Sequence, residues 1–324
     1  MRKIASETLS FMKMARNRLF NRFDAPVVVL AYHRVTSLPS DPQMLAVTPG
    51  NFRAHMQHLK ANLSLARFEE GWAGIKRPAV VVTFDDGYAD NALEALPILE
   101  EVGVPATFFI STGNINASKE FWWDELERII LCGRGIPAVF TGIDGDSRHR
   151  WPTANDDERR RFYHEIHNLL KGKDAAERDR WLAHMRRWAE VDEDGRETHR
   201  VLTDDLIRRL SASRWATIGA HAISHTPLSF LSAPKQEEEI IGSKRTLEEL
   251  TGGKVTVFSY PFGGRNDYSP ESIDICRRAG FIKAAACIPG QAHRWTDPHQ
   301  IPRQCVRDWP VNLFTRQVER FMFQ

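Results

Sequence analysis

The sequence predicts an α/β fold in which six to eight strand–helix units form a barrel, with a helical insertion in the middle of the chain. Two short apolar runs rich in valine, 25–32 and 79–84, are typical of strands buried on both faces of a parallel sheet. Helical patterns lie between successive runs, and strand, helix, strand in steps of this length indicates βαβ units. A long charged stretch with helical periodicity then interrupts the alternation.

The first half of the chain supplies three strands and two helices. Apolar residues at helical spacing follow Asn51, which we expect to be the N-cap of the first helix. Pro97 lies inside the second helical pattern and should kink or restart that helix, and Gly103 should close it. The expected elements are strand 25–32, helix 51–63, strand 79–84, helix 92–102 and strand 106–110.

The segment from about 117 to 213 is expected to be a helical insertion grafted onto the core rather than a separate domain with its own linkers. It is rich in Arg, Glu and Asp, and its charge runs are typical of solvated helix faces. We interpret its tryptophans as packing anchors. After it the expected elements are strand 215–221, helix 233–250, strand 255–260, helix 270–278, strand 281–287, strand 301–306 and helix 312–323.

The composition indicates a globular protein and does not favour a nucleic-acid partner. The 324 residues are 42% hydrophobic and 27% charged, which is enough to bury a core. Forty-four Lys and Arg residues against 42 Asp and Glu residues leave a formal net charge of +2, whereas nucleic-acid binding requires a basic stripe. The cysteines are scattered and form no Cys-x-x-Cys motif, so we expect reduced thiols. They are Cys132, Cys276, Cys287 and Cys305.

Residues 1–24 are expected to form a basic amphipathic helix. Basic residues interrupt the apolar ones, so the continuous apolar region of a secretory signal is lacking. No segment approaches the roughly 20 apolar residues of a membrane span. We therefore expect a cytoplasmic location. The helix either packs on the domain or makes a peripheral contact with the anionic inner face of a membrane.

Polar side chains at two strand ends favour a metal site. Asp85 and Asp86 follow a valine run, and adjacent residues on a strand point to opposite sides. His221 ends a later strand, and on a helical turn His225 would share one face with it. Asp86 and the two histidines would leave open positions for water and substrate, as catalytic zinc sites require. Asp85, turned away from the metal, is then placed to act as a general base.

Two further segments complete the candidate site. A metal in this position would polarise a carbonyl and lower the pKa of a water molecule, and a second group must protonate the leaving amine. His33, at the end of the first strand, is the candidate for that acid. A turn after a later strand can present a backbone N–H to a developing oxyanion. This turn consists of Tyr260, Pro261, Phe262 and Gly263.

Together these motifs resemble those of the polysaccharide deacetylase family, the NodB-homology group of carbohydrate esterases. The resemblance rests on three motifs and spans about 26–113 and 214–308. The motifs are 83–87 (Thr-Phe-Asp-Asp-Gly), 221–225 (His-Ala-Ile-Ser-His) and 260–263 (Tyr-Pro-Phe-Gly).

The resemblance implies a fold, a cofactor and a set of roles. The implied fold is a distorted (β/α)7–8 barrel, and the implied cofactor is a divalent metal, often Zn²⁺, held by Asp86, His221 and His225. Asp85 would be the base, and the backbone N–H of Phe262 would help to hold the oxyanion. The implied reaction is hydrolysis of an N-acyl group, usually acetyl, on an amino sugar.

Two positions depart from the family pattern. Ser259 stands where many members have an arginine that orients the base, and Arg303 is a candidate to replace that arginine from another strand. The C-terminal Leu-x-His of many members is missing. Residues 30–33 (Leu-Ala-Tyr-His) are similar to that motif moved to the N-terminus, as in circularly permuted members that act on poly-N-acetylglucosamine. This similarity supports His33 as the acid.

The expected function is therefore a metal-dependent hydrolase that removes an N-acyl group from an amino sugar. Because no secretion signal is found, the expected substrate is a cytosolic, nucleotide-linked or lipid-linked precursor of a surface polysaccharide. Two alternatives stay open. One is a deformylase or another C–N hydrolase of a small non-sugar amide, and the other is a catalytically silent protein that binds glycans.

Overall fold

The computed structural model of the chain describes residues 17–133 and 135–323. These residues form two compact units, of which unit 1 comprises 17–113 and 204–323 and unit 2 comprises 114–203. Most of the expected N-terminal helix, residues 1–16, lies outside the described residues, so its membrane contact stays a prediction; 17–20 are helical. Among the described helices, none combines the length and apolar character that a transmembrane span requires.

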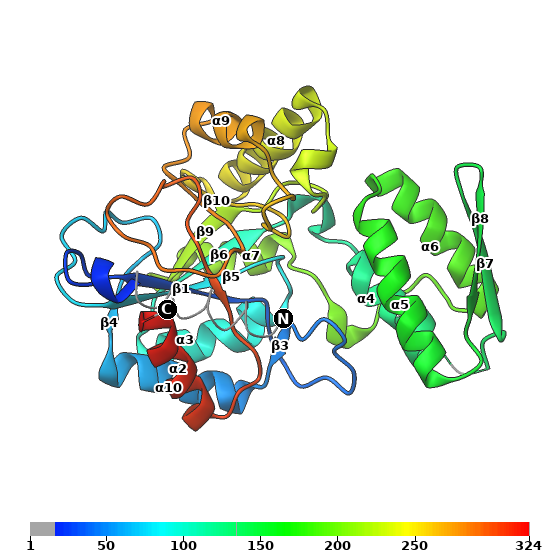
Figure 1. The fold of residues 1–324 in the computed structure, drawn as a ribbon, viewed down its shortest axis with the longest axis horizontal. Coiled ribbons are helices and arrows are strands. Elements are labelled where there is room, and N and C mark those ends of the chain that lie inside the picture. The colour runs from blue at the N-terminus through cyan, green and yellow to red at the C-terminus, as the bar shows by residue number, and fades with distance from the viewer. Residues whose placement is uncertain (1–16, 134, 324) are drawn as a thin grey trace, which may run out of the picture. The chain divides into compact units, whose positions relative to one another are not determined.

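Unit 1 is built on an eight-stranded parallel sheet (Figure 1). Its strands are β1 (Val27–Tyr32), β4 (Ser64–Leu65), β5 (Ala79–Phe84), β6 (Ala106–Ile110), β9 (Ala216–Ala220), β10 (Val257–Ser259), β11 (Lys283–Ala285) and β12 (Gln304–Cys305). They follow the order β11-β10-β9-β6-β5-β1-β12, with β4 paired to β5. A parallel bridge joins Ala285 of β11 to Ile301, close to β12. The sheet therefore curls round on itself, and the predicted α/β fold is confirmed.

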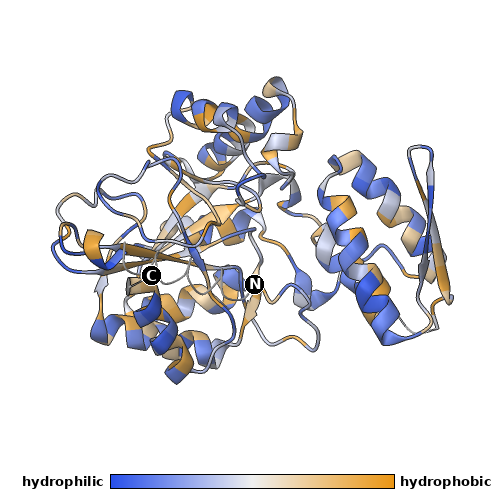
Figure 2. Cartoon of the chain, in the orientation of Figure 1, coloured by the Kyte–Doolittle hydropathy of each residue, from blue (hydrophilic) through white to orange (hydrophobic). Residues whose placement is uncertain are grey.

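The two valine-rich strands form the centre of this sheet. Every residue of β1 and β5 is buried, and both strands are coloured as hydrophobic in Figure 2. Their parallel register aligns Tyr32 with Phe84, the last residue of each strand. His33 and Asp85, which follow these residues, therefore emerge at the same edge of the sheet.

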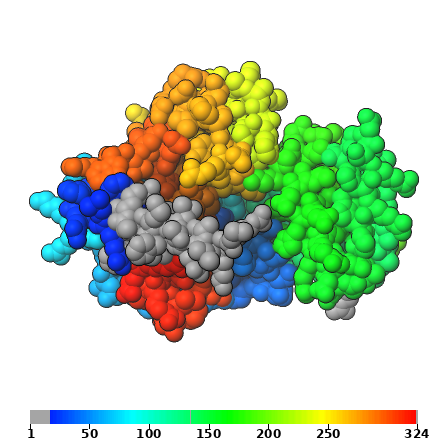
Figure 3. All heavy atoms as spheres, viewed as in Figure 1, coloured from blue at the N-terminus to red at the C-terminus, as the bar shows by residue number. Residues whose placement is uncertain are grey.

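The helices of unit 1 cover the outside of the sheet, and α8 and α9 lie side by side on the surface in Figure 3. The helices are α2 (Pro49–Asn62), α3 (Leu96–Val102), α7 (Asp204–Ala212), α8 (Ala233–Thr251), α9 (Pro270–Arg278) and α10 (Val311–Phe323). Short elements complete the unit: β2 (Arg34–Val35), β3 (Ala46–Val47), a π-helical segment (Asn91–Ala95) and 3-10 turns at Thr112–Asn114 and Leu228–Phe230.

Two local predictions about these helices have different outcomes. Pro97 does restart its helix, since the π-helical segment gives way to α3 one residue before it, and α3 ends at Gly103 in a left-handed conformation. The N-cap prediction for Asn51 is wrong. Helix α2 begins earlier, with Thr48 at the N-cap position but without a side-chain capping hydrogen bond, because Pro49 can occupy the first turn without needing an N–H partner. The amide of Asn51 instead donates to Asp308 over 2.7 Å.

Unit 2 combines helices with an unexpected β-hairpin. Its main elements are α4 (Trp122–Glu127), a π-helical segment (Arg128–Cys132), β7 (Val139–Asp144), β8 (Ser147–Pro152), α5 (Asp156–Lys171), α6 (Ala175–Ala189) and a 3-10 turn (Glu197–His199). The expectation of a helical insertion is thus corrected by the antiparallel pair β7–β8. Phe140 and Trp151 of the hairpin pack with Phe162 and Trp181 of the helices, so these tryptophans are packing anchors.

Candidate active site

The C-terminal end of β5 presents two carboxylates with different backbone conformations. The N–H of Asp85 donates to the carbonyl of Tyr32 and continues the strand pairing. Asp86 instead has a left-handed φ of 75°, and Gly87 follows with a φ of 102°. A left-handed conformation costs a non-glycine residue about 1 kcal/mol and is typical of functional sites. Both carboxylates are nearly inaccessible, with 5% and 3% exposure respectively.

His221 and His225 lie on a loop, which corrects the expectation of a helical turn. His221 continues the pairing of β9, because its N–H donates to the carbonyl of Ile110. Ala222 and His225 then have left-handed φ values of 61° and 52°, and such residues cannot belong to a right-handed helix. The loop still brings the two imidazole rings to 4.9 Å between centroids.

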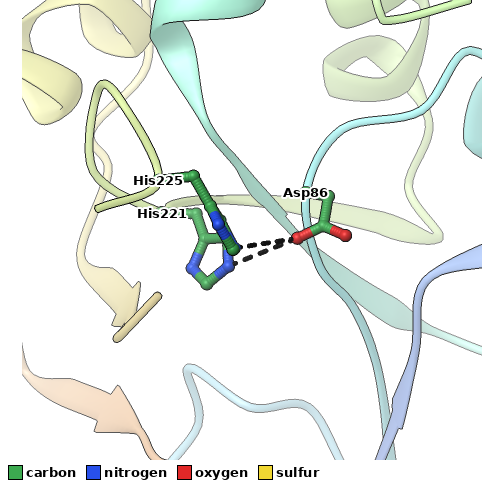
Figure 4. Close-up of side chains that lie close together, drawn as sticks. All are labelled: Asp86, His221 and His225. Carbon is green, nitrogen blue, oxygen red and sulfur yellow. Dashed lines mark ion pairs between the residues drawn. The ribbon is translucent and has the colours of Figure 1, made fainter. Parts of the chain in front are cut away.

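The side chains of Asp86, His221 and His225 converge, as Figure 4 shows. Oδ1 of Asp86 lies 3.2 Å from Nε2 of His225 and 3.6 Å from Nε2 of His221. One potential ligand atom from each residue lies within 4.8 Å of the other two, and all three residues are buried. The predicted metal-binding residues therefore come together in space.

The chemistry of these donors fits a divalent metal ion. Nδ1 of His221 lies 2.7 Å from the carbonyl oxygen of Ser259. Because a carbonyl only accepts, Nδ1 of His221 carries a proton, and Nε2 is the ring nitrogen that faces the cluster. Burial raises the pKa of Asp86, but its contacts with both histidines outweigh burial, so this pKa lies well below its usual range. Two imidazoles and an ionised carboxylate are a ligand set that zinc accepts.

Asp85 lies beside this cluster and is bound by Arg303. The guanidinium donates from Nη1 to Oδ1 over 2.7 Å and from Nη2 to Oδ2 over 2.6 Å. Nη1 and Nη2 also donate to the hydroxyls of Thr83 and Ser259, and Nε donates to the carbonyl of Ala286. Burial raises the pKa of Asp85, but the charge of Arg303 outweighs burial, so the net pKa is lowered. Asp85 is thus ionised and fixed in orientation.

His33 follows β1 at the same edge, within electrostatic reach of both carboxylates. The charge of His33 also lowers the pKa values of Asp85 and Asp86, but this effect is smaller than those of burial and of the nearer partners. Its Nδ1 is buried and has no hydrogen-bond partner among the described residues. The amide of Asn91 donates to the backbone carbonyl of His33 over 2.8 Å. Asp90 accepts from the backbone N–H of Val35 over 3.0 Å.

In the turn after β10, the side chain of Tyr260 lies in the core, whereas that of Phe262 lies beside the candidate metal site. Tyr260 is fully buried, and its hydroxyl donates to the carbonyl of His299, so its side chain belongs to the core. The ring of Phe262 lies 4.7 Å from that of His225, and Phe262 has a left-handed φ of 59°. Gly263 must lack a side chain, because a Cβ would lie 2.6 Å from the backbone nitrogen of Cys287. Pro261 accepts from the N–H of Gly263.

Comparison with known sequences identifies the family of this chain. The sequence model described as polysaccharide deacetylase matches residues 74–138 and 155–281, more than half of the chain. The chain belongs to the polysaccharide deacetylase family. The matched ranges contain both carboxylates of β5, both histidines of the loop and the turn 260–263, while His33 and Arg303 lie outside them.

Individual polysaccharide deacetylases are similar to this chain at low identity. The Bacillus subtilis (strain 168) protein named "Putative polysaccharide deacetylase YxkH" is 22% identical over 277 residues, which are 83% of this chain and 67% of that protein. BC0361, a polysaccharide deacetylase from Bacillus cereus, has a TM-score of 0.59 at 20% identity and covers 91% of this chain and 70% of its own. IcaB from Ammonifex degensii has a TM-score of 0.58 at 18% identity and covers 93% of this chain and 98% of its own. These structures share the fold.

A glutamate that no sequence motif marks holds the histidine loop in place. Oε2 of Glu239, on α8, accepts the backbone N–H groups of Ile223 and Ser224, each over 2.8 Å. Its Oε1 accepts the hydroxyl of Ser224 over 2.6 Å. Glu239 belongs to a run of three glutamates in an amphipathic helix, and nothing in that run distinguishes it from a solvated residue.

Proposed function

We propose that this polysaccharide deacetylase family member is a metal-dependent hydrolase that removes an N-acyl group, in the first place acetyl, from an amino sugar. One observation carries the proposal. The three potential metal ligands and an ionised carboxylate bound by an arginine lie at a single edge of the curled sheet. Parallel α/β folds place their active sites at this C-terminal edge.

Asp85 is the proposed general base. Its lowered pKa keeps it ionised at neutral pH, and the two hydrogen bonds from Arg303 fix its orientation. In this role Asp85 accepts a proton from the water that attacks the amide carbonyl. Arg303 is 1% exposed and acts through Asp85, so we propose it as a positioning residue without substrate contact.

His33 is the proposed general acid. It donates a proton to the amine nitrogen as the C–N bond breaks, which allows the amino sugar to leave as a neutral amine. The hydrogen bond from Asn91 to its backbone carbonyl holds it at the end of β1. A divalent metal held by Asp86, His221 and His225, with zinc as the first candidate, would polarise the amide carbonyl and lower the pKa of a nearby water molecule.

A substrate panel tests this function. The zinc-loaded chain is incubated with N-acetylglucosamine oligomers, UDP-N-acetylglucosamine and a polyprenyl-linked N-acetylglucosamine, and released acetate is measured. We expect release from at least one of them, which would also test the predicted nucleotide-linked or lipid-linked precursor. Asp85→Asn should reduce the rate at least ~100-fold, since general bases typically contribute 10²–10⁴-fold.

The same panel separates the two alternatives. Release of formate from N-formyl compounds without release of acetate would favour a deformylase. Measurable binding of the oligomers without release of any acid, at every metal loading, would overturn the proposal in favour of a glycan-binding protein.

A further inference from the structure

Cys287 and Cys305 do not form a Cys-x-x-Cys motif, but their side chains meet at the ends of neighbouring segments of the curled sheet. The Sγ atoms of Cys287 and Cys305 lie 3.1 Å apart, although the two residues are 18 positions apart in the sequence. Both residues are free and partly exposed. Of the other two cysteines, Cys276 is buried and Cys132 belongs to unit 2.

The backbone explains why these two side chains meet. Cys287 follows β11 and Cys305 ends β12. Hydrogen bonds join these two segments, from the N–H of Ala286 to the carbonyl of Ile301 and from the N–H of Arg303 to the carbonyl of Ile288. The neighbouring segments thus run in parallel, with their side chains held in a fixed register.

The pair adjoins two residues of the proposed active site. Cys305 lies two positions after Arg303, and side chains two positions apart along an extended segment point to the same face. It is also aligned with Ala31 of β1, two positions before His33. Cys287 directly follows Ala286, whose carbonyl accepts the Nε of Arg303. The thiols therefore lie next to the segment that carries Arg303.

The surroundings of Cys305 favour its thiolate. The hydrogen bond from the Cys287 thiol and the positive charges of His33 and Arg303 lower the pKa of Cys305. Together they outweigh burial, which raises it, so the net pKa is lowered. The pKa of Cys287 is raised, first by its bond to Cys305 and then by burial. Cys305 is therefore the nucleophile of the pair, and Cys287 is the resolving thiol.

We propose that Cys287 and Cys305 are a redox modification site, at which a low-molecular-weight disulfide such as oxidised glutathione converts the two thiols into a reversible intramolecular disulfide. The Cys305 thiolate attacks one sulfur of glutathione disulfide, forms a mixed disulfide and releases one glutathione. Cys287 then loses its proton and attacks Sγ of Cys305, which releases the second glutathione. One disulfide is reduced and one is formed, so electrons and atoms balance.

The two sulfur atoms need to move about 1 Å closer to reach the 2.05 Å of a disulfide bond. Their segments are already hydrogen bonded, so the closure requires side-chain adjustment rather than strand separation. The resulting bond would tie down residues 288–304, including Arg303. This inference does not depend on the proposed deacetylation, because the disulfide can be detected without any substrate.

The test equilibrates the native, full-length chain in buffers of reduced and oxidised glutathione, followed by acid quenching, alkylation and digestion without reduction. We expect mass spectrometry to find one cross-linked peptide pair joining Cys287 and Cys305, with the loss of two hydrogens, and full alkylation of both in excess reduced glutathione. Cys287→Ser and Cys305→Ser should abolish that pair, whereas Cys276→Ser should leave it unchanged. Alkylation of both cysteines at the most oxidising ratio, or separate glutathione adducts on each without a cross-link, would overturn the proposal.

Discussion

Arg303 binds Asp85 through two hydrogen bonds although strand β1 lies between their strands in the sheet. Asp85 follows β5 and Arg303 precedes β12, and the order of the strands is β5-β1-β12. The guanidinium reaches across because its planar fork matches the carboxylate, with distances of 2.7 and 2.6 Å. Additional bonds to Thr83 and Ser259 fix the plane of the fork.

Replacing Arg303 by lysine should therefore lower kcat more than it changes KM. Lysine keeps the positive charge but cannot form two parallel hydrogen bonds with Asp85. A base displaced by about 1 Å can cost about 100-fold in rate, so we expect kcat to fall 10- to 100-fold. KM should change less than about threefold, because Arg303 is 1% exposed and its proposed role is to orient Asp85. Initial rates of acetate release over a range of substrate concentrations would measure both constants.

Arg307→Lys is the matched control for this experiment. Arg307 lies on the same segment and donates to the backbone carbonyls of Gln43 and Met44, away from Asp85. Its kinetics should match the wild type. A rise in KM for Arg303→Lys at constant kcat would contradict the positioning role and would assign Arg303 to substrate binding.

Removal of metal should lower the thermal stability of unit 1. A ligand that binds only the native state adds RT ln(1 + [L]/Kd), or about 2.7 kcal/mol at a concentration 100-fold above Kd. Zinc added to the chelator-treated chain should therefore raise Tm, as measured by calorimetry. His225→Ala removes one of the proposed ligands and should abolish the rise. His58→Ala, on helix α2 outside the cluster, should retain it, and an equal rise in both variants would place the bound zinc elsewhere.

The sequence could predict which strands meet, because buried valine runs define the strands and parallel strands end at a common edge. The common edge is sufficient to predict that Asp85 and Asp86 lie close to His221, whereas Arg303 is predicted as a partner of Asp85 only through the family resemblance. The sequence could not predict the conformation of the histidine loop. The left-handed residues there are Ala222 and His225, and neither is glycine, the residue type that adopts this conformation most readily.

Contacts of polar side chains with residues far away in the chain could not be predicted from the sequence either. His55, which lies in the expected helix 51–63, is buried and stacks on Phe314 of α10 with 3.8 Å between ring centroids. The helical pattern of α2 predicts which face of the helix is buried, but not which residue of another element will pack against that face. The hairpin β7–β8 did have a signal, since Gly145 and Asp146 form a two-residue turn between its strands. The sequence of β8 is mostly polar and lacks the apolar pattern typical of a strand, so the strand could not be predicted.

Loss of Glu239 should weaken metal binding without removing a ligand. Its carboxylate accepts three hydrogen bonds from Ile223 and Ser224 and so holds the loop between the two histidines. Supporting residues of this kind typically contribute 10- to 100-fold in metal affinity, and we expect such a loss for Glu239→Ala in zinc competition against a fluorescent chelator. Glu238→Ala removes an exposed neighbour that pairs with Lys235 and should not change the affinity. Equal affinities for both variants would show that the strand alone fixes the loop.

Buried His55 should make the chain less stable as the pH falls below about 6.5. Burial lowers its pKa to about 4, against the smaller raising effect of the Trp309 carbonyl. Between these values the unfolded chain holds a proton that the native chain does not, so the free energy of unfolding falls by up to about 1.4 kcal/mol per pH unit. Urea unfolding at pH 7 and pH 5 should show His55→Gln losing about 2 kcal/mol less than the wild type over this interval. Tyr32→Phe removes the hydroxyl 3.3 Å from Nδ1 of His55 but keeps the imidazole, so it should retain the wild-type loss. An equally steep loss in His55→Gln would assign the pH dependence to another group.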